Sequence, residues 1–165
     1  MWKLGKISDG IIDNSFLNLN YVSEPFNDEK TLEEWKNTYG DIFSTGEMAD
    51  FRQSQPEWTT NIINYLNLKL SGSSYYRMTP GKILPYHRDT YKRYIDYYKI
   101  LDLNSIHRAI VFLEDWQPGH VFEIDGYPIT NYRAGTFVMW NYDTPHLAAN
   151  LGLNDRYTLQ ITGVL

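Results

Sequence analysis

The sequence contains no cysteine. Disulfide bonds and thiolate-bound metals are therefore excluded, and any metal has to be held by histidine, carboxylate or water. Histidine is itself scarce, because the 165 residues include only four, which are His87, His107, His120 and His146. Few combinations of residues can therefore form a metal site.

Long apolar runs are also missing. The N-terminal stretch MWKLGKISDGIIDN lacks the apolar core of a signal peptide, and no run elsewhere approaches the length that spans a bilayer. We therefore expect a soluble, cytoplasmic protein with no membrane partner.

An excess of basic residues is absent as well. Fifteen Lys and Arg residues against 20 Asp and Glu residues give a net charge of −5, and the cations form no dense run. Because phosphate backbones are bound by clustered cations, no nucleic-acid partner is expected. The sequence leaves the oligomeric state open.

Aromatic residues are abundant, at 16% of the chain with 14 tyrosines and 5 tryptophans. They pack well on pleated strands. From Ser73 onward, short strand-like runs alternate with Pro, Gly, Asn and Asp, and Asp125-Gly126 is a good two-residue hairpin turn. Many short strands predict a sandwich or barrel. The predicted strands are residues 74–78, 82–87, 108–113, 120–124, 127–130, 136–140 and 157–165.

Two core-facing helices are expected before this region. Residues 31–43 have a capping box at their start, an apolar stripe and a glycine stop. Residues 55–72 have a proline near their start and one apolar face, which consists of Trp58, Ile62, Leu66 and Leu70. A length of 165 residues fits one domain. We therefore expect a single domain, 1–165, with helical and mixed support in residues 1–74 and the motif-bearing part in residues 75–165.

The connector at residues 90–105 interrupts the strands. Tyr91, Tyr94 and Tyr98 fall at helical spacing, which predicts a short amphipathic helix or an ordered loop. Two interpretations stay open. The connector is either a solvated link or a lid that walls a substrate pocket, and its tyrosines are then candidates for substrate contact.

His87 and Asp89 form the main candidate for chemistry. Residues i and i+2 of a strand project from the same face, so the two side chains would lie side by side. His146, beyond Pro145 in GTFVMWNYDTPHLAAN, is the best third ligand. Two histidines and one carboxylate on one face of an ion leave the opposite face open and suit non-haem Fe(II). An HxD triplet alone is a weak signal.

Arg156 follows on a predicted strand, where it shares a face with Thr158 and Gln160. A buried arginine is costly unless it meets an anion. A dicarboxylate would supply one, gripped by two parallel hydrogen bonds, and Thr158 could add a hydroxyl. The alternative is a surface salt bridge with a neighbour such as Asp155.

These residues resemble a known family. The order His87, Asp89, His146 and then Arg156 resembles the Fe(II)/2-oxoglutarate-dependent dioxygenases. The stretches RMTPGKILPYHRD and HLAANLGLNDRYTL are similar to the prolyl and aspartyl/asparaginyl hydroxylase branch. The similarity covers residues 75–165. It implies a mainly β fold with flanking helices, whose core is a double-stranded β-helix, also called a jelly roll and shared with the cupins.

The resemblance also implies a site. His87, Asp89 and His146 would be the catalytic residues and hold Fe(II), and Arg156 and Thr158 would bind the far carboxylate of 2-oxoglutarate. O2 would take the remaining position on the metal, and the reaction would release succinate and CO2. The substrate would be a prolyl or aspartyl/asparaginyl side chain, free or within a peptide or protein.

Further residues have secondary roles in this prediction. Arg108 resembles an arginine of this branch, although it lies 21 positions after His87 and the branch's histidine two places later is Ile110. We assign it to carboxylate binding, with a structural ion pair as the alternative. Tyr76, rather than Arg77, is expected to face the cavity and to donate a hydrogen bond to the co-substrate.

Three residues are candidates for the substrate side. Trp140, on the strand before His146, would wall the pocket or pack in the core. Asn150 would hold the loop after His146 or touch substrate, and Tyr91 belongs to the connector. His107 is expected to point away from Arg108, and His120 to open a hairpin, with a substrate contact as its alternative.

Other functions stay open. A cupin-like metal-binding protein would bind metal without 2-oxoglutarate chemistry. In a non-catalytic interaction module, the substitutions His87→Ala and Asp89→Ala would leave the metal content of the protein unchanged. A nucleic-acid dealkylase is disfavoured by the negative charge and by the lack of a second arginine shortly after Arg156.

Overall fold

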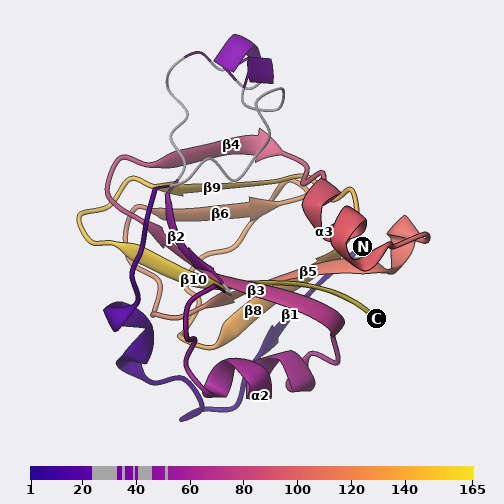
Figure 1. Ribbon diagram of the computed structural model, residues 1–165. Coiled ribbons are helices and arrows are strands. Elements are labelled where there is room, and N and C mark those ends of the chain that lie inside the picture. The colour runs from indigo at the N-terminus through magenta and orange to yellow at the C-terminus, as the bar shows by residue number, and fades with distance from the viewer. Residues whose placement is uncertain (24–32, 35, 39, 41–45, 51) are drawn as a thin grey trace.

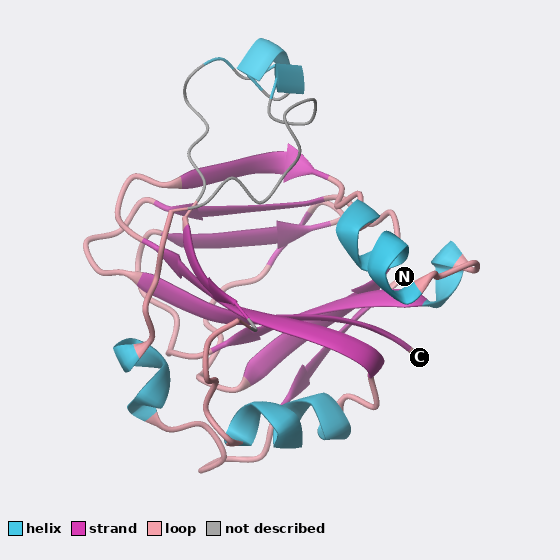
Figure 2. Cartoon of the chain, viewed as in Figure 1, coloured by secondary structure: helices cyan, strands magenta, loops and turns pink. Residues whose placement is uncertain are grey.

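Strands dominate the computed structural model, which describes residues 1–23, 33–34, 36–38, 40, 46–50 and 52–165. Figure 1 shows two stacked layers of strands with short helices at the periphery, and Figure 2 shows the same arrangement by element type. The strands are β1 (Trp2–Lys6), β2 (Glu47–Asp50), β3 (Lys69–Met78), β4 (Ile83–His87), β5 (Ile106–Phe112), β6 (His120–Ile124), β7 (Tyr127–Pro128), β8 (Thr136–Asn141), β9 (His146–Asn150) and β10 (Arg156–Val164). The helical elements are η1 (Asn14–Asn18), α2 (Trp58–Tyr65), α3 (Lys92–Tyr98) and η3 (Leu103–Ser105).

The strands form two antiparallel sheets. One sheet has the order β1-β8-β5-β10-β3-β2, and the other has the order β4-β9-β6-β7. From β3 to β10 the chain crosses repeatedly from one sheet to the other. This winding is a double-stranded β-helix, so the fold class expected from the sequence is confirmed.

The space between the sheets is filled by apolar side chains from both layers. Strand residues alternate between the two faces of a sheet, so every second residue of a strand enters this inner core. The inner core consists of Tyr76, Met78, Ile110, Phe112, Phe122, Ile124, Ile129, Tyr132, Val138, Trp140 and Ala148.

A second core lies on the outer face of the six-stranded sheet. The alternate residues of the same strands, such as Tyr75 and Val111, pack there against Trp58, Ile62 and Leu66 from the α2 region and against Phe16 of η1. The larger sheet is therefore buried on both faces, and only its inner face can contribute to a pocket between the sheets.

The strand predictions from Ser73 onward are confirmed. Every predicted run contains a strand, although the run at 127–130 is paired only at Tyr127–Pro128. Ile124 pairs with Tyr127 across a turn in which Asp125 and Gly126 have φ angles of 51° and 80°. Two positive φ angles are the signature of a type I′ hairpin turn, as the Asp-Gly pair predicted.

The predicted helix at 55–72 is too long. The helix α2 ends at Tyr65, and Asn67 then takes a left-handed conformation with φ 56°, which stops the helix. Trp58, Ile62 and Leu66 are buried as expected, but Leu70 is half exposed because it already belongs to β3. The sequence interpretation also missed β1 and β2, which add to the two edges of the larger sheet, and β9, which lies between β4 and β6 in the smaller sheet.

The predicted helix at 31–43 lies mostly outside the described residues. The described residues 33–34 and 36–38 are helical, and Gly40 has a left-handed φ of 69°. None of the helices that the structure describes is both long and apolar enough to cross a membrane.

The connector at 90–105 contains a helix, as its tyrosine spacing predicted. Helix α3 is bounded by Tyr91 and Lys99, both of which are left-handed. The hydroxyls of Tyr94 and Tyr98 donate hydrogen bonds to the carbonyls of Leu70 and Ser71, at 2.9 and 3.3 Å. These bonds attach α3 to the start of β3.

Candidate metal centre

Two neighbouring strands of the smaller sheet bring His87, Asp89 and His146 together. His87 ends β4 and pairs with His146, the first residue of β9, and their ring centroids are 4.3 Å apart. Asp89 lies just beyond β4 rather than within it, yet its carboxylate oxygens are 3.8 Å from the Nε2 atoms of both histidines. One potential ligand atom from each residue lies within 4.8 Å of the others. The spacing suits a single bound ion.

Backbone carbonyls orient both imidazole rings. His87 Nδ1 is 2.7 Å from the Pro85 carbonyl, and His146 Nδ1 is 3.1 Å from the Thr144 carbonyl. A carbonyl only accepts, so each Nδ1 carries a proton, and in both rings Nε2 is the nitrogen that faces Asp89. This is the arrangement by which outer partners prepare histidine for a metal.

The protonation states also suit a cation. Burial alone would raise the pKa of Asp89, but Arg108 and the two histidines outweigh burial and hold this pKa well below its usual value. Burial lowers the pKa of His146 to about 4. The three groups therefore present one carboxylate and a neutral His146 imidazole near neutral pH.

Arg108 is paired with Asp89 rather than free for a ligand carboxylate. Its Nε and Nη2 atoms are each 3.2 Å from Asp89 Oδ2, and its guanidinium carbon lies 5.4 Å from the centre of the Tyr91 ring. Of the two roles considered from the sequence, this geometry supports the structural ion pair, and because Arg108 also lines the pocket its assignment to carboxylate binding stays a prediction. Arg108 thus helps to hold Asp89 in place.

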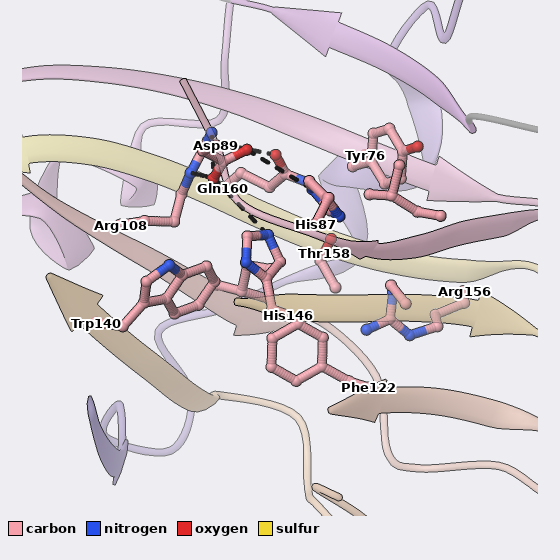
Figure 3. Close-up of a pocket in the computed structure, with 13 residues that line it drawn as sticks. Tyr76, His87, Asp89, Arg108, Phe122, Trp140, His146, Arg156, Thr158 and Gln160 are labelled. Atoms are coloured by element: carbon pink, nitrogen blue, oxygen red, sulfur yellow. Dashed lines mark hydrogen bonds and ion pairs between the residues drawn. The ribbon is translucent and has the colours of Figure 1, made fainter. Parts of the chain in front are cut away.

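A pocket between the sheets opens beside the three residues (Figure 3). It is walled mainly by the inner faces of β3, β5, β8 and β10 on one side and of β4, β6 and β9 on the other. Its lining consists of Tyr76, Leu84, His87, Asp89, Arg108, Ile110, Phe122, Trp140, His146, Ala148, Arg156, Thr158 and Gln160.

Arg156 is 2% exposed and lines this pocket. Its Nη1 lies 3.8 Å from Met78 Sδ, but its Nε and Nη2 atoms and the Thr158 hydroxyl have no hydrogen-bond partner among the described residues. The alternative salt bridge with Asp155 is not formed, because Asp155 accepts a hydrogen bond from Tyr157 instead. Buried donors without partners are costly, so this group is prepared for an anionic ligand.

Aromatic rings lie around the arginine. Its guanidinium carbon is 5.5 Å from the centre of Phe112 and 6.0 Å from that of Phe122, and the Phe122 ring centre is 6.4 Å from the His146 ring. Figure 3 shows Phe122 below the gap between His146 and Arg156. The metal position and Arg156 therefore face one short apolar channel.

The remaining predicted residues have varied places. Tyr76 faces the pocket, as predicted, and its hydroxyl accepts a hydrogen bond from Gly46 N at 2.5 Å, which leaves its own proton to donate. Arg77 points outward to Glu47, with Nε 2.6 Å from Oε2. Trp140 lines the pocket, and its ring centre is 4.8 Å from that of His146.

Asn150 does not line the pocket. Its amide nitrogen donates to the Met78 and Asn154 carbonyls at 2.6 and 2.8 Å, and its Oδ1 accepts from Gly152 N at 3.0 Å. It therefore holds the loop after β9, which was the first of its two predicted roles, and the assignment to substrate contact gains no support from this pocket. Tyr91 is likewise not a lining residue, because it lies against Arg108.

The other two histidines are outside the site. His107 Nδ1 contacts the Ser105 carbonyl at 2.9 Å, and the residue lies on the opposite face of β5 from Arg108. His120 is buried at the start of β6, with Nε2 3.4 Å from the Asn154 carbonyl. Neither lines the pocket.

Sequence reasoning missed some of the lining. Leu84, Ile110, Phe122 and Ala148 were not assigned to a site, although each lies in a strand. Alternation along each strand could have placed them on the inner face, but not beside the metal position. That placement depends on which strands face each other.

Comparison with solved structures supports the fold. A prolyl-4-hydroxylase from Pseudomonas putida matches with a TM-score of 0.59 and 14% identity over 99% of this chain and 91% of that one. A predicted oxalate decarboxylase from Thermotoga maritima matches with a TM-score of 0.45 and 17% identity over 72% and 80% of the two chains.

No protein-family model and no curated protein matches the chain. At 14% identity, the match to the Pseudomonas putida structure speaks for the fold alone. The chain thus shares the double-stranded β-helix fold of the Pseudomonas putida enzyme and carries a His-Asp-His cluster suited to a metal.

Proposed function

We propose that the protein is an Fe(II)- and 2-oxoglutarate-dependent dioxygenase that hydroxylates an amino-acid side chain. The preferred substrates are prolyl or aspartyl/asparaginyl residues, free or in a peptide. One observation carries the proposal: the pocket that holds the His-Asp-His cluster also holds the unpartnered donors of Arg156 and Thr158.

The residues fit both groups. Two imidazoles and one carboxylate form a ligand set that suits Fe(II) and leaves positions open. His87, Asp89 and His146 would hold the metal. Arg156 would take the far carboxylate of a dicarboxylate through Nε and Nη2, with help from the hydroxyls of Thr158 and Tyr76.

Iron, 2-oxoglutarate and O2 would together supply the oxidation, in which one oxygen atom of O2 enters succinate as CO2 is released and the other hydroxylates a C–H bond of the substrate. The chain itself positions the metal ligands and shields the channel from water. Arg108 keeps Asp89 ionised and in place, the carbonyls of Pro85 and Thr144 fix the imidazoles, and the aromatic wall keeps water from the channel.

The proposal is tested by anaerobic addition of Fe(II) and 2-oxoglutarate, with the visible metal-to-ligand charge-transfer band as the readout. We expect the band with the wild-type protein and its loss in Arg156→Ala at the same 2-oxoglutarate concentration. Arg133→Ala is the matched control, because Arg133 is an exposed arginine paired with Asp115.

Iron binding without the band would contradict the proposal. It would favour a cupin-like metal-binding protein without 2-oxoglutarate chemistry. A band that survives Arg156→Ala unchanged would contradict the role of Arg156.

A further inference from the structure

The indole N–H of Trp140 is a buried donor without a partner. Trp140 is 1% exposed and lines the pocket, and its Nε1 atom has no hydrogen-bond partner among the described residues. Leaving a buried N–H unpaired is costly, and native proteins rarely do so without a reason. Because its ring lies beside His146, the free N–H is part of the region around the metal centre.

Two other tryptophans have partners for their indole N–H groups. Trp58 Nε1 donates to Asp13 Oδ1 at 3.0 Å, and Trp116 Nε1 donates to the His120 carbonyl at 2.9 Å. Neither lines the pocket. Among the described residues, Trp140 thus has a buried indole N–H without a partner, and this N–H lies at the pocket, unlike those of Trp58 and Trp116.

This donor and Arg156 come from positions that are separated along the sheet. Trp140 pairs with Arg108 across β8 and β5, and Arg108 pairs with Thr162, six residues beyond Arg156 along β10. The two side chains approach the same ring, because the Trp140 ring centre and the Arg156 guanidinium carbon are each 6.0 Å from the centre of Phe122. Figure 3 shows Trp140 and Arg108 at one end, Arg156 at the other and His146 between them. An anion held by Arg156 therefore leaves the Trp140 end for another ligand.

Among the described residues that line the Trp140 end, the cationic side chain is Arg108, and its charge is compensated. Arg108 is neutralised by Asp89, and its Nη1 donates to Gln160 Oε1 at 3.4 Å. This bond turns the Gln160 amide so that its NH2 group is left as a donor, with no partner among the described residues. The groups that remain, an indole N–H and a carboxamide NH2, are both neutral donors. They match a neutral acceptor better than a charged carboxylate.

We propose that the Trp140 end of the pocket binds an amide carbonyl oxygen of the substrate, with Trp140 Nε1 as the main donor and Gln160 Nε2 as the second. The substrate is then a peptide or another amide rather than a free amino acid. This inference rests on the proposed function for identifying the pocket as a substrate site, and it narrows the substrate class.

Nuclear magnetic resonance of the indole N–H groups tests the inference. The full chain is labelled with 15N, loaded with Zn(II) and 2-oxoglutarate, and titrated with L-prolinamide and aspartic acid diamide. L-Proline and L-aspartate are the carboxylate counterparts. Loss of one peak in Trp140→Phe assigns the Trp140 resonance. We expect at least one of the two amides to change the chemical shift of the Trp140 indole resonance in a saturable manner. The two acids should leave this chemical shift unchanged.

Two variants add an affinity measurement by calorimetry. Trp140→Phe keeps a ring in the core but removes the donor, and it should weaken binding of the responding amide about five- to tenfold. Gln160→Met removes the second donor, together with the acceptor for Arg108 Nη1, and should also weaken binding. Trp116→Phe is the matched control and should leave the affinity unchanged, since its indole is bonded outside the pocket.

The inference is wrong if no amide moves the Trp140 resonance, or if the acids move it as much as the amides do. These outcomes are separable from failure of the proposed function. A missing charge-transfer band with an intact amide response contradicts 2-oxoglutarate chemistry alone. A normal band without an amide response contradicts the carbonyl site alone.

Discussion

At the scale of single residues, the site depends on groups that prepare three side chains for one ion. The carbonyls of Pro85 and Thr144 fix the protons of His87 and His146, and Arg108 fixes Asp89. Pro85, His87, Arg108 and His146 belong to strands, whereas Asp89 and Thr144 lie within two residues of a strand end. The geometry is therefore set before any metal arrives.

Loss of one ligand should abolish metal retention. In His146→Ala or Asp89→Ala, two ligands remain, which is too few for a stable site, so bound iron measured by elemental analysis should fall to background. His107→Ala is the matched control, because His107 lies on another face of β5 and should leave the iron content unchanged. Equal iron in Asp89→Ala and wild type would remove Asp89 from the site.

The sequence predicted some of these residues better than others. Alternation along one strand was enough to put Arg156, Thr158 and Gln160 on a shared inner face, and all three line the pocket. The partner of Arg108 could not be predicted in this way. Asp89 follows β4 of the other sheet, and only the packing of the two sheets brings the pair together.

At the scale of elements, two loops at one end of the sheets approach closely through glycine. Gly119 precedes β6 with φ 93°, and a Cβ atom there would collide with the backbone of Gly152. Leu151 N also donates to the Gly119 carbonyl at 2.8 Å. The loop before β6 and the loop after β9 are thereby joined.

Gly119→Ala should destabilise the fold more than Gly126→Ala does. Both positions have positive φ, which costs about 1 kcal/mol for alanine, but only Gly119 also faces a backbone clash. We expect a total loss of about 2–4 kcal/mol at Gly119 in urea titrations. Equal losses at the two positions would show that the close approach of the loops contributes nothing.

Elements were easier to predict where the apolar pattern was local. The hairpin turn at Asp125-Gly126 depends on only two neighbouring residues, and it was predicted correctly from their identity. The end of α2 was misjudged because Leu66 and Leu70 continue a helical spacing across Asn67, where the chain turns into β3. β1 is recognisable as a strand mainly through its pairing with β8, which the sequence alone does not reveal.

At the scale of the whole molecule, the six-stranded sheet lies between two apolar cores, and buried polar residues are few. His120 is one of them, 3% exposed at the start of β6. Burial lowers its pKa and the nearby positive charge of Arg156 lowers it further, while a bond to Asn154 acts in the opposite sense. The folded state therefore disfavours protonated His120.

This shift predicts a loss of stability in mild acid. Above about pH 6.5 His120 is neutral in both states, and below that value the unfolded chain binds a proton that the folded chain resists. The free energy of unfolding should fall as pH drops from about 7.5 to 5, more steeply in wild type than in His120→Gln. His146 contributes equally to both proteins, so the difference between the two curves isolates His120. Parallel curves from urea titrations would contradict the prediction.

The most direct test of the central claim is the fate of 2-oxoglutarate. Purified protein is supplied with Fe(II), 2-oxoglutarate and O2, and succinate is measured over time against 2-oxoglutarate consumed. We predict one succinate for each 2-oxoglutarate consumed by wild type and none with Asp89→Ala. Wild-type protein that retains its iron and leaves 2-oxoglutarate intact would contradict the proposed dioxygenase.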